Sequence, residues 1–217
     1  MSTDSRLFDE IERHLLKDEQ PSQFLIDLAK RPEFSRYPLT MLKRLITTEQ
    51  SPVHHPEGNV WNHTLLVVDE AAKLRHKSKD ARVLMWSALL HDTGKPDTTK
   101  VRKGKITAYD HDRAGEKLAR EFLTHFTDDT ALVDTVCGLV RYHMQILYVA
   151  KGLPFADIKG MKQRTDIREV ALIGLCDRLG RTHADREKEE QNIARFVAQC
   201  TTGLVTTLDE AQSEFLR

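Results

Sequence analysis

The chain has 217 residues, of which 40% are apolar and 30% are charged, a composition typical of a soluble globular protein. Its 33 Lys and Arg residues balance its 33 Asp and Glu residues, which argues against a general nucleic-acid coat but allows a local basic patch. No run of about 18 apolar residues occurs, so we expect no membrane span. The first residues lack a signal-peptide core, so we expect a cytoplasmic protein.

Apolar residues recur at helical spacing along most of the chain. In chain order, this pattern predicts helices over 5–17, 21–31, 38–48, 60–76, 80–92, 112–126, 129–144, 166–180 and 183–200. Residues 98–109 place Lys103-Gly104-Lys105 between short β-prone pieces, which predicts a small hairpin. Residues 145–165 contain Gly152, Pro154 and Gly160 and are predicted to be less regular. For residues 201–217 we expect a loop or a short helix.

The fold class predicted from these elements is all-α. We expect residues 1–50 to form a short helical appendage on a domain spanning 51–200, followed by a tail over 201–217. Asp80 and Asp166 are predicted N-caps, and Glu169 would complete a capping box with Asp166. The cysteines, Cys137, Cys176 and Cys200, occur singly within helical patterns, which indicates buried free thiols of a reducing compartment.

The helix over 80–92 is apolar almost all round, which places it at the centre of the core. It ends on His91 and Asp92, and a buried charge is costly unless it is paired. His63 has Leu66, Val67 and Leu74 as helical neighbours, so we expect it to face inward. Asp177 also lies on a helix rich in apolar residues.

Each of these four polar groups has a plain structural explanation, as a hydrogen-bonded core histidine or a salt-bridged aspartate. Together they supply two imidazoles and two carboxylates. That set suits a divalent ion such as Mn²⁺, Fe²⁺, Ni²⁺, Co²⁺ or Mg²⁺ with open positions for water or phosphate. It lacks the thiolates of a structural zinc site.

The order His63, His91-Asp92, Asp177 resembles the HD superfamily of metal-dependent phosphohydrolases. The segments HPEGNVWNHTLLVVDEAA, ALLHDTGKP, YDHDRAGEKL, RYH and LCDRLGR resemble the HD domain attached to certain bacterial tRNA nucleotidyltransferases. This resemblance implies an HD-domain helical bundle over residues 51–200 and a metal held by His63, His91, Asp92 and Asp177. It also implies hydrolysis of phosphate monoesters or diesters.

Further polar residues match positions that bind a second ion or clamp phosphate in relatives. His111 and His143 are the candidates for a second metal or for substrate, against the plainer readings of a loop residue and a core histidine. Lys95 follows Gly94 near the expected site and is assigned a catalytic role with Asp92, against a solvated lysine at a helix end. The lower-ranked phosphate contacts are Arg113, Arg141, Arg178 and Arg181.

The remaining polar features have weaker functional readings. His54 and His55 precede Pro56 and are expected to be solvated loop residues, unless this loop forms a lid over the substrate. The run KVRKGK over 100–105 is expected to be a solvated hairpin, although near a metal site it could guide an RNA or nucleotide backbone.

The predicted function is therefore hydrolysis of a small phosphate ester, with Asp92 binding the ion and accepting a proton from water. The favoured substrates are nucleotides or RNA ends, of the 2′,3′-cyclic phosphate or 2′-nucleotide type. The alternative is a noncatalytic HD module that binds nucleotide or RNA. Residues 1–50 contain no polymerase motif, so we expect no nucleotide addition. The ion count, one or two, and the oligomeric state are left open.

Overall fold

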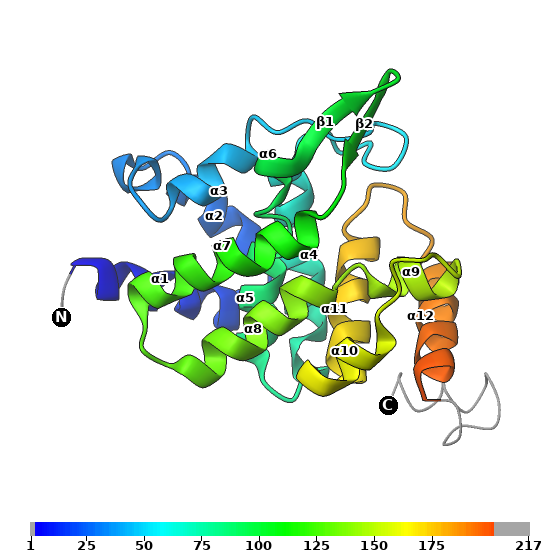
Figure 1. Ribbon diagram of the computed structural model, residues 1–217. Coiled ribbons are helices and arrows are strands. Elements are labelled where there is room, and N and C mark those ends of the chain that lie inside the picture. Colours follow the sequence, from blue (N-terminus) through cyan, green and yellow to red (C-terminus); the bar gives the residue numbers. More distant parts are fainter. Residues whose placement is uncertain (1–2, 202–217) are drawn as a thin grey trace.

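Helices form most of the protein, as predicted, in a computed structural model that describes residues 3–201 (Figure 1). The N-terminal part contains α1 (Thr3–Lys17), α2 (Pro21–Leu28), η1 (Pro32–Ser35) and α3 (Thr40–Leu45). The middle contains α4 (Val60–Leu74), η2 (Arg75–Lys77), α5 (Ala81–Leu90), α6 (Lys95–Thr98), β1 (Thr99–Arg102) and β2 (Lys105–Ala108). The rest contains α7 (His111–Phe126), α8 (Thr130–Tyr142), α9 (Gln145–Ala150), α10 (Ile158–Arg164), α11 (Ile167–Leu179) and α12 (Arg186–Cys200).

Helix α5 is the centre of the bundle, as its all-round apolar sequence predicts. Every residue from Val83 to Leu90 is buried, and α5 packs against α1, α4, α8 and α11. Its start is fixed by Asp80, whose side chain accepts a hydrogen bond from the amide of Arg82 at 2.8 Å. An N-cap of this kind satisfies an amide that the helix itself leaves unpaired. Burial on all sides therefore holds the C-terminal end of α5 in a fixed place.

The N-terminal helices share the apolar core of the bundle. The ring of Phe8 on α1 stacks on Trp86 of α5, with centroids 4.8 Å apart. The Trp86 indole N–H donates to Glu12 at 2.9 Å, and Arg82 donates to the same carboxylate oxygen. Residues of α1 thus bury part of α5, while a domain boundary near residue 50 stays a prediction.

One local prediction was incomplete and another was wrong. The segment 145–165 contains α9 and α10, whose separate lengths of one or two turns are too short for a periodicity argument. The Glu169 carboxylate does not complete a capping box, because it accepts from the Ser78 hydroxyl at 2.6 Å and the Lys79 amide at 2.9 Å. The cap at Asp166 is present, with a 2.7 Å bond from the amide of Arg168.

Other predictions can be compared directly with the structure. The predicted hairpin is present as antiparallel β1 and β2. The three cysteines are buried free thiols. Within residues 3–201, no helix combines the length and the apolar character needed to cross a membrane. The prediction for residues 202–217 lies outside the described residues.

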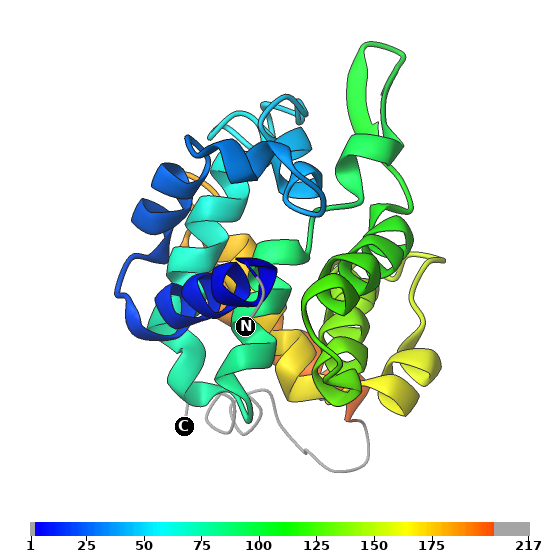
Figure 2. The ribbon, with the colours of Figure 1, turned by 90° about the vertical axis from the view of Figure 1, so that its left-hand side faces the viewer.

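The hairpin stands out from one end of the helical bundle (Figures 1 and 2). It follows directly on α6, which packs against the start of α7 and against α3. The turn between α5 and α6 is tight, because Gly94 lies against the backbone of His111 and Gly115 in α7. The residues that could carry chemistry gather at this end of the bundle.

Candidate metal centre

Five helices bring polar side chains to one end of the bundle. Helix α4 contributes a residue of its first turn, whereas α5, α8 and α11 contribute residues at their C-terminal ends and α7 contributes its first residue. Since α4 and α7 begin at the site while α5, α8 and α11 end there, residues far apart in the chain meet. They are His63 of α4, His91 and Asp92 after α5, His143 after α8, Asp177 of α11 and His111 of α7.

The first cluster joins His63, His91, Asp92 and Asp177. The Nε2 atom of His63 lies 3.0 Å from Asp177 Oδ1 and 3.9 Å from Asp92 Oδ2. His91 Nε2 lies 3.2 Å from the same Asp92 oxygen. His63, His91 and Asp92 are almost completely buried, and their ligand atoms all lie within 4.8 Å of one another. The geometry thus brings together the four residues predicted to bind a metal.

The second cluster joins Asp92, His111 and His143. The Nε2 atoms of the two histidines are 3.2 Å apart, and Asp92 Oδ1 lies 3.5 Å from His111 Nε2 and 4.0 Å from His143 Nε2. These three side chains are also buried, and they meet the spacing of a metal-binding group. Asp92 therefore presents one oxygen to each cluster.

The tautomers of three histidines follow from their backbone contacts. His91, His111 and His143 each place Nδ1 within 2.9 Å of a carbonyl oxygen three residues earlier in the chain. A carbonyl can only accept, so Nδ1 carries the proton and Nε2 of the neutral ring keeps its lone pair. The Nε2 atoms of His111 and His143 are then two acceptors facing each other at 3.2 Å.

The electrostatics of the site keep the two aspartates ionised and the two histidines of the second cluster neutral. Burial opposes ionisation of Asp92, but its neighbours His91 and Lys95 outweigh that effect and hold its pKa well below the usual value. Asp177 behaves in the same way, with Arg181 and His63 lowering its pKa. Burial lowers the pKa of His111, and it lowers that of His143 to about 4.

The donor set fits a divalent cation better than it fits a closed hydrogen-bond network. His91 Nε2 is buried without a hydrogen-bond partner, although an anionic oxygen lies 3.2 Å away. Lone pairs from imidazoles and carboxylates face one another, and only a cation or an added proton would relieve that repulsion. Metal-binding histidines commonly have a backbone carbonyl or carboxylate on the other nitrogen, as found here.

A model of the HD domain family matches residues 60–182. The chain belongs to the HD domain family. The matched range contains both clusters, which share Asp92. The all-α bundle is the fold that the sequence resemblance predicted.

Curated relatives match parts of this chain. The "Multifunctional CCA protein" of Actinobacillus pleuropneumoniae serotype 5b (strain L20) is 33% identical over 116 residues, which cover 54% of this chain and 28% of that protein. That of Aromatoleum aromaticum is 30% identical over 183 residues, covering 81% of this chain and 43% of that protein. The "CC-adding tRNA nucleotidyltransferase" of Thermus thermophilus is 32% identical over 145 residues, covering 65% and 32%. The chain thus spans less than half the length of these relatives.

Lys95 of this HD domain is buried beside Asp92. Its Nζ lies 2.6 Å from Asp92 Oδ2 and donates to the side-chain oxygen of Gln50 at 2.6 Å. An ammonium held in this way neutralises part of the carboxylate charge and has two fixed acceptors. It is therefore a positioned cation at the floor of the site, not the solvated lysine of the alternative reading. Gln50 was not predicted, because a glutamine in a connecting loop carries no motif.

The arginines divide into two groups. Arg181 lies 3.4 Å from Asp177 Oδ2, and Arg141 contacts Asp112. Arg113 is exposed and lies 3.8 Å from Asp110 Oδ1 at the mouth of the cleft. These three line the cleft of the HD domain, whereas Arg178 bonds Glu189 at 2.8 Å and faces α12. Of the four arginines proposed from sequence as phosphate contacts, Arg178 is thus the one that lies away from the site.

His63 faces inward as expected, but two details of its surroundings differ from the sequence prediction. Leu66 is 39% exposed, so the inward face of α4 is narrower than the sequence pattern suggested. His55 is not a solvated loop residue, because its side chain is only 13% exposed and Nδ1 lies 2.9 Å from Glu57 Oε1. Its neighbour His54 is exposed, as expected. Glu57 itself was missed, although the segment HPEG of the sequence resemblance contains it.

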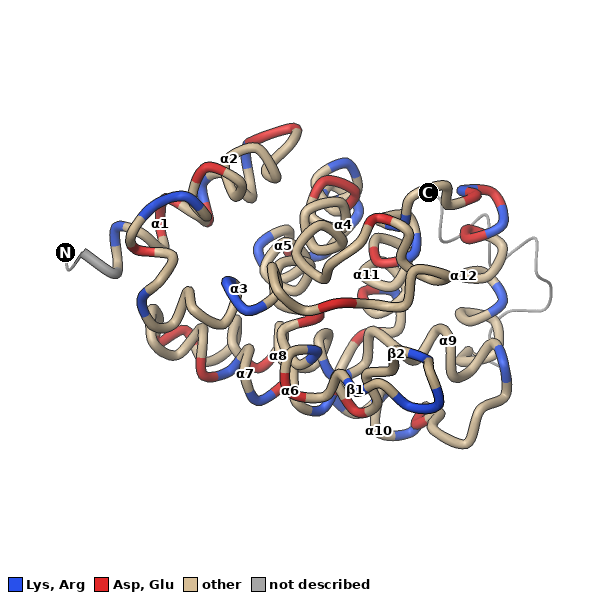
Figure 3. The backbone as a smooth tube through the Cα atoms, turned by 90° about the horizontal axis from the view of Figure 1, so that it is seen from above, with Lys and Arg blue, Asp and Glu red and all other residues tan. Residues whose placement is uncertain are grey.

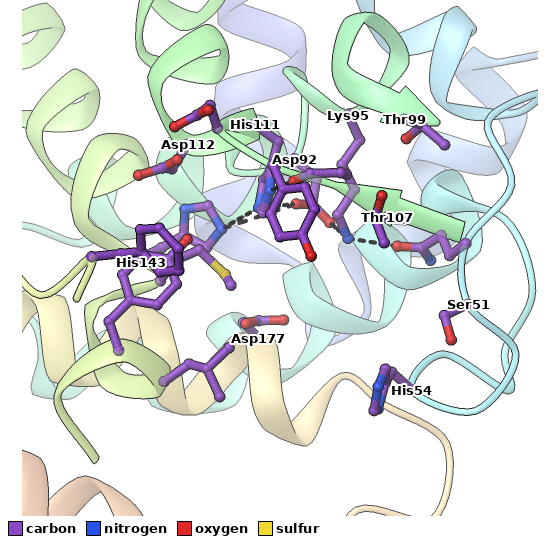
Figure 4. Close-up of a pocket in the computed structure, with 18 of the residues that line it drawn as sticks. Ser51, His54, Asp92, Lys95, Thr99, Thr107, His111, Asp112, His143 and Asp177 are labelled. Carbon is purple, nitrogen blue, oxygen red and sulfur yellow. Dashed lines mark hydrogen bonds and ion pairs between the residues drawn. The ribbon is translucent and has the colours of Figure 1, made fainter. Parts of the chain in front are cut away.

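A cleft with a volume of about 1140 Å³ opens above both clusters. Asp92, Lys95, His111, His143 and Asp177 face this space (Figure 4). One wall is the β1-β2 hairpin, and another is the segment after His143. A third wall is the loop around Ser51 and His54. The HD site is thus open to a ligand larger than inorganic phosphate.

Proposed function

We propose that this HD domain is a metal-dependent phosphohydrolase that cleaves phosphate monoesters or diesters of nucleotides or RNA ends. The favoured substrates carry a 2′,3′-cyclic phosphate or a 2′-phosphate. One observation carries the proposal: imidazole lone pairs and both oxygens of an ionised Asp92 converge at the floor of an open cleft. Buried anionic and lone-pair groups of this kind are stable when they bind a cation.

Divalent ions held there would polarise a phosphoryl oxygen and lower the pKa of bound water. His63, His91, Asp92 and Asp177 are the proposed ligands of the first ion, which would be Mn²⁺, Fe²⁺, Ni²⁺, Co²⁺ or Mg²⁺. Lys95 and Arg181 would stabilise negative charge on the phosphoryl oxygens. The low pKa of Asp92 favours its action as a ligand over the proton acceptance also considered from sequence.

We further propose two ions per site. The second would be bound by His111 and His143, with Asp92 as the bridge between the clusters. Support comes from Asp92, whose Oδ2 faces His63 and His91 while its Oδ1 faces His111 and His143. If the site held one ion, His111 and His143 would instead contact phosphate as neutral imidazoles. Each would then have to donate a hydrogen bond from Nε2, the nitrogen that carries a lone pair and no proton.

The walls of the cleft support a substrate in which the phosphate is carried by a nucleoside. Tyr148 and Phe155 form an aromatic pair with centroids 5.6 Å apart on one wall, and Phe155 is 59% exposed. Aromatic rings beside a phosphate site are suited to stack a base. On the hairpin wall, Lys and Arg follow β1, the turn and β2 (Figure 3), where they can attract a phosphate backbone. The printed names of the relatives, which refer to CCA and tRNA, agree with such a substrate.

The test of hydrolysis begins with EDTA-treated protein that is reloaded with Mn²⁺, Ni²⁺ or Mg²⁺. Ion content is measured by elemental analysis, and turnover is measured on nucleoside 2′,3′-cyclic phosphates, 2′-nucleotides and bis-p-nitrophenyl phosphate. We expect two ions per chain and metal-dependent turnover. Asp92→Asn should lose both, because Asp92 contacts both clusters.

Asp110→Asn is the matched control for Asp92→Asn. Asp110 lines the same cleft but is exposed, and its φ of 60° is one that asparagine readily adopts. It should keep wild-type turnover. Metal binding without turnover of any ester would favour the noncatalytic module, and a wild-type protein that binds no ion would overturn the proposal.

The substrate is tested with Phe155→Ala. Loss of a stacked ring costs about 1–3 kcal/mol per base, so kcat/KM for a 2′-nucleotide should fall roughly 5- to 150-fold. The kcat/KM for glycerol 2-phosphate, which has no base, should not change. Tyr37→Ala serves as the control, since Tyr37 is 57% exposed and does not line the cleft. Equal effects on both esters would argue against base recognition at this wall.

A further inference from the structure

Glu57 lies behind His63, on the side of the ring that faces away from the two clusters. Its side chain is only 3% exposed. Oε1 lies 2.8 Å from His63 Nδ1 and 2.9 Å from His55 Nδ1. A carboxylate is acceptor-only when ionised, and its two histidine neighbours lower the pKa of Glu57 against the effect of burial. Both imidazoles therefore turn Nδ1 toward one anionic oxygen, His55 through a hydrogen bond and His63 through a close ion-pair contact.

The backbone around Glu57 is shaped to hold this carboxylate in place. Gly58 has a φ of 102°, which ends the turn that begins at His55. The Asn62 side chain donates to the carbonyl oxygen of Glu57 at 3.0 Å. The amide of Thr182 lies 3.4 Å from Glu57 Oε2. Glu57 thus links the loop before α4 with α4 itself and with the segment that follows α11.

His63 differs from the other three histidines of the clusters in the group that contacts its Nδ1 atom. His91, His111 and His143 donate Nδ1–H to neutral carbonyl oxygens, whereas His63 faces a carboxylate. A carboxylate behind a histidine fixes which nitrogen carries the proton and makes the other nitrogen a stronger ligand. For His63 that other nitrogen is Nε2, which faces Asp177 at 3.0 Å.

We propose that Glu57 is the positioning residue of the first cluster: it holds the proton of His63 on Nδ1 and turns Nε2 toward the metal. His55 supports it by binding the same oxygen, and the His55 ring packs edge-on against His63 with centroids 4.6 Å apart. This inference rests on the proposed metal centre. It extends that centre to a loop outside the matched range 60–182.

The direct test is the affinity for Mn²⁺ alone, measured by calorimetry without any phosphate ester. Glu57→Gln keeps the side-chain length and one acceptor oxygen but loses the charge. We expect its Mn²⁺ dissociation constant to rise about 10- to 100-fold, while the thermal midpoint of the metal-free protein stays close to wild type. Glu57→Asp, which keeps the charge on a shorter side chain, should recover part of the affinity.

Glu49→Gln is the matched control. Glu49 lines the same cleft and is exposed, so this variant removes an equal charge without removing the contact with His63. It should bind Mn²⁺ like wild type. If Glu57→Gln and Glu57→Ala also bind like wild type, Glu57 only anchors its loop and the inference is wrong. If Glu49→Gln and Glu57→Gln lost equal Mn²⁺ affinity, the effect would come from the net charge near the cleft and not from the contact with His63. That result would also overturn the inference.

A second measurement separates this inference from the proposed function. Nitrogen NMR of the histidine side chains reports which nitrogen of His63 carries a proton in metal-free protein. Because Asp177 and Glu57 raise the pKa of His63 against burial, the spectra are recorded above that pKa, where the ring is neutral and carries a single proton. We expect the Nδ1–H form in wild type and a mixture of tautomers in Glu57→Ala. If the protein binds Mn²⁺ but hydrolyses no ester, the proposed activity fails and the role of Glu57 stands. If the wild type binds no metal, an unchanged His63 tautomer in Glu57→Ala would disprove the positioning role too.

Discussion

At the scale of single residues, the site is defined by which nitrogen of each histidine carries a proton. The 2.7 Å contacts of His111 and His143 with backbone carbonyls place their protons on Nδ1. Burial lowers the pKa of both rings, so they remain neutral where free imidazole would be half charged. Neutral rings with inward lone pairs are ready to bind a cation without first releasing a proton.

The pKa of His143 predicts a pH dependence of the metal-free protein. Its value of about 4 in the folded state lies below the 6.5 of the unfolded chain, so the unfolded chain takes up the proton first as the pH falls. The free energy of unfolding should therefore decrease between pH 6.5 and 4, with His143 contributing up to roughly 3 kcal/mol.

Urea unfolding of EDTA-treated protein at pH 7, 6 and 5 measures this effect. His143→Gln lacks the titrating ring and should show a shallower loss of stability than wild type over that range. His63, whose bonds to Asp177 and Glu57 raise its pKa against burial, contributes with the opposite sign and is present in both proteins. Identical slopes for the two proteins would contradict the burial of a neutral His143.

At the scale of secondary-structure elements, the site is made by helix ends. His91 and His143 follow the last residues of α5 and α8, and Asp177 lies in the last turn of α11. The turn after His91 and Asp92 must be tight, because it passes directly against α7. Gly94 allows this approach: a Cβ there would lie 2.1 Å from the carbonyl oxygen of His111 and 2.5 Å from the amide of Gly115.

Gly94→Ala should therefore push α7 away from the turn and displace His111. Because the clash is with backbone atoms that cannot rotate away, we expect a loss of about 1–3 kcal/mol or more in the free energy of unfolding. Urea titration measures the loss, and weaker Mn²⁺ binding would accompany it. Gly104→Asn is the control, since Gly104 is in open space and its φ of 72° suits asparagine. Wild-type stability of Gly94→Ala would show that this packing is not required.

At the scale of the whole molecule, one apolar core supports the bundle and the site together. Helices α1 and α2 bury surfaces of α5 and α4, and the polar clusters lie at one end of this core. Buried carboxylates and lone pairs oppose folding when they are unpaired. Cations at the site should therefore stabilise the entire fold and not only the loops around the cleft.

Mn²⁺ at 100 times its dissociation constant should raise the free energy of unfolding by about 2.7 kcal/mol, since the unfolded chain does not assemble the site. Thermal unfolding of EDTA-treated protein, with and without added Mn²⁺, measures this stabilisation. The Asp110→Asn control should respond like wild type, and Asp92→Asn should not respond. A thermal midpoint that Mn²⁺ leaves unchanged in wild type would argue against a metal that binds the folded state.

Much of this protein follows from local pattern. The all-round apolar sequence over 80–92 places α5 at the centre, and Asp80 and Asp166 mark helix starts, because helical spacing and capping act within a few residues. The order His63, His91-Asp92, Asp177 indicates the family and the candidate ligands. The short helices α9 and α10 escape such reasoning, since one or two turns interrupted by Gly152 and Pro154 leave too few residues to show a period.

What required the folded chain is contact between segments distant in sequence. The pairing of His63 with Asp177, of Gln50 with Lys95 and of Glu169 with Ser78 depends on helix packing, and no local rule encodes it. The same holds for the two oxygens of Asp92, which meet different histidines only because five helices converge. Local propensities act over one or two turns, whereas a buried polar group takes whichever partner the packed core brings within about 3 Å.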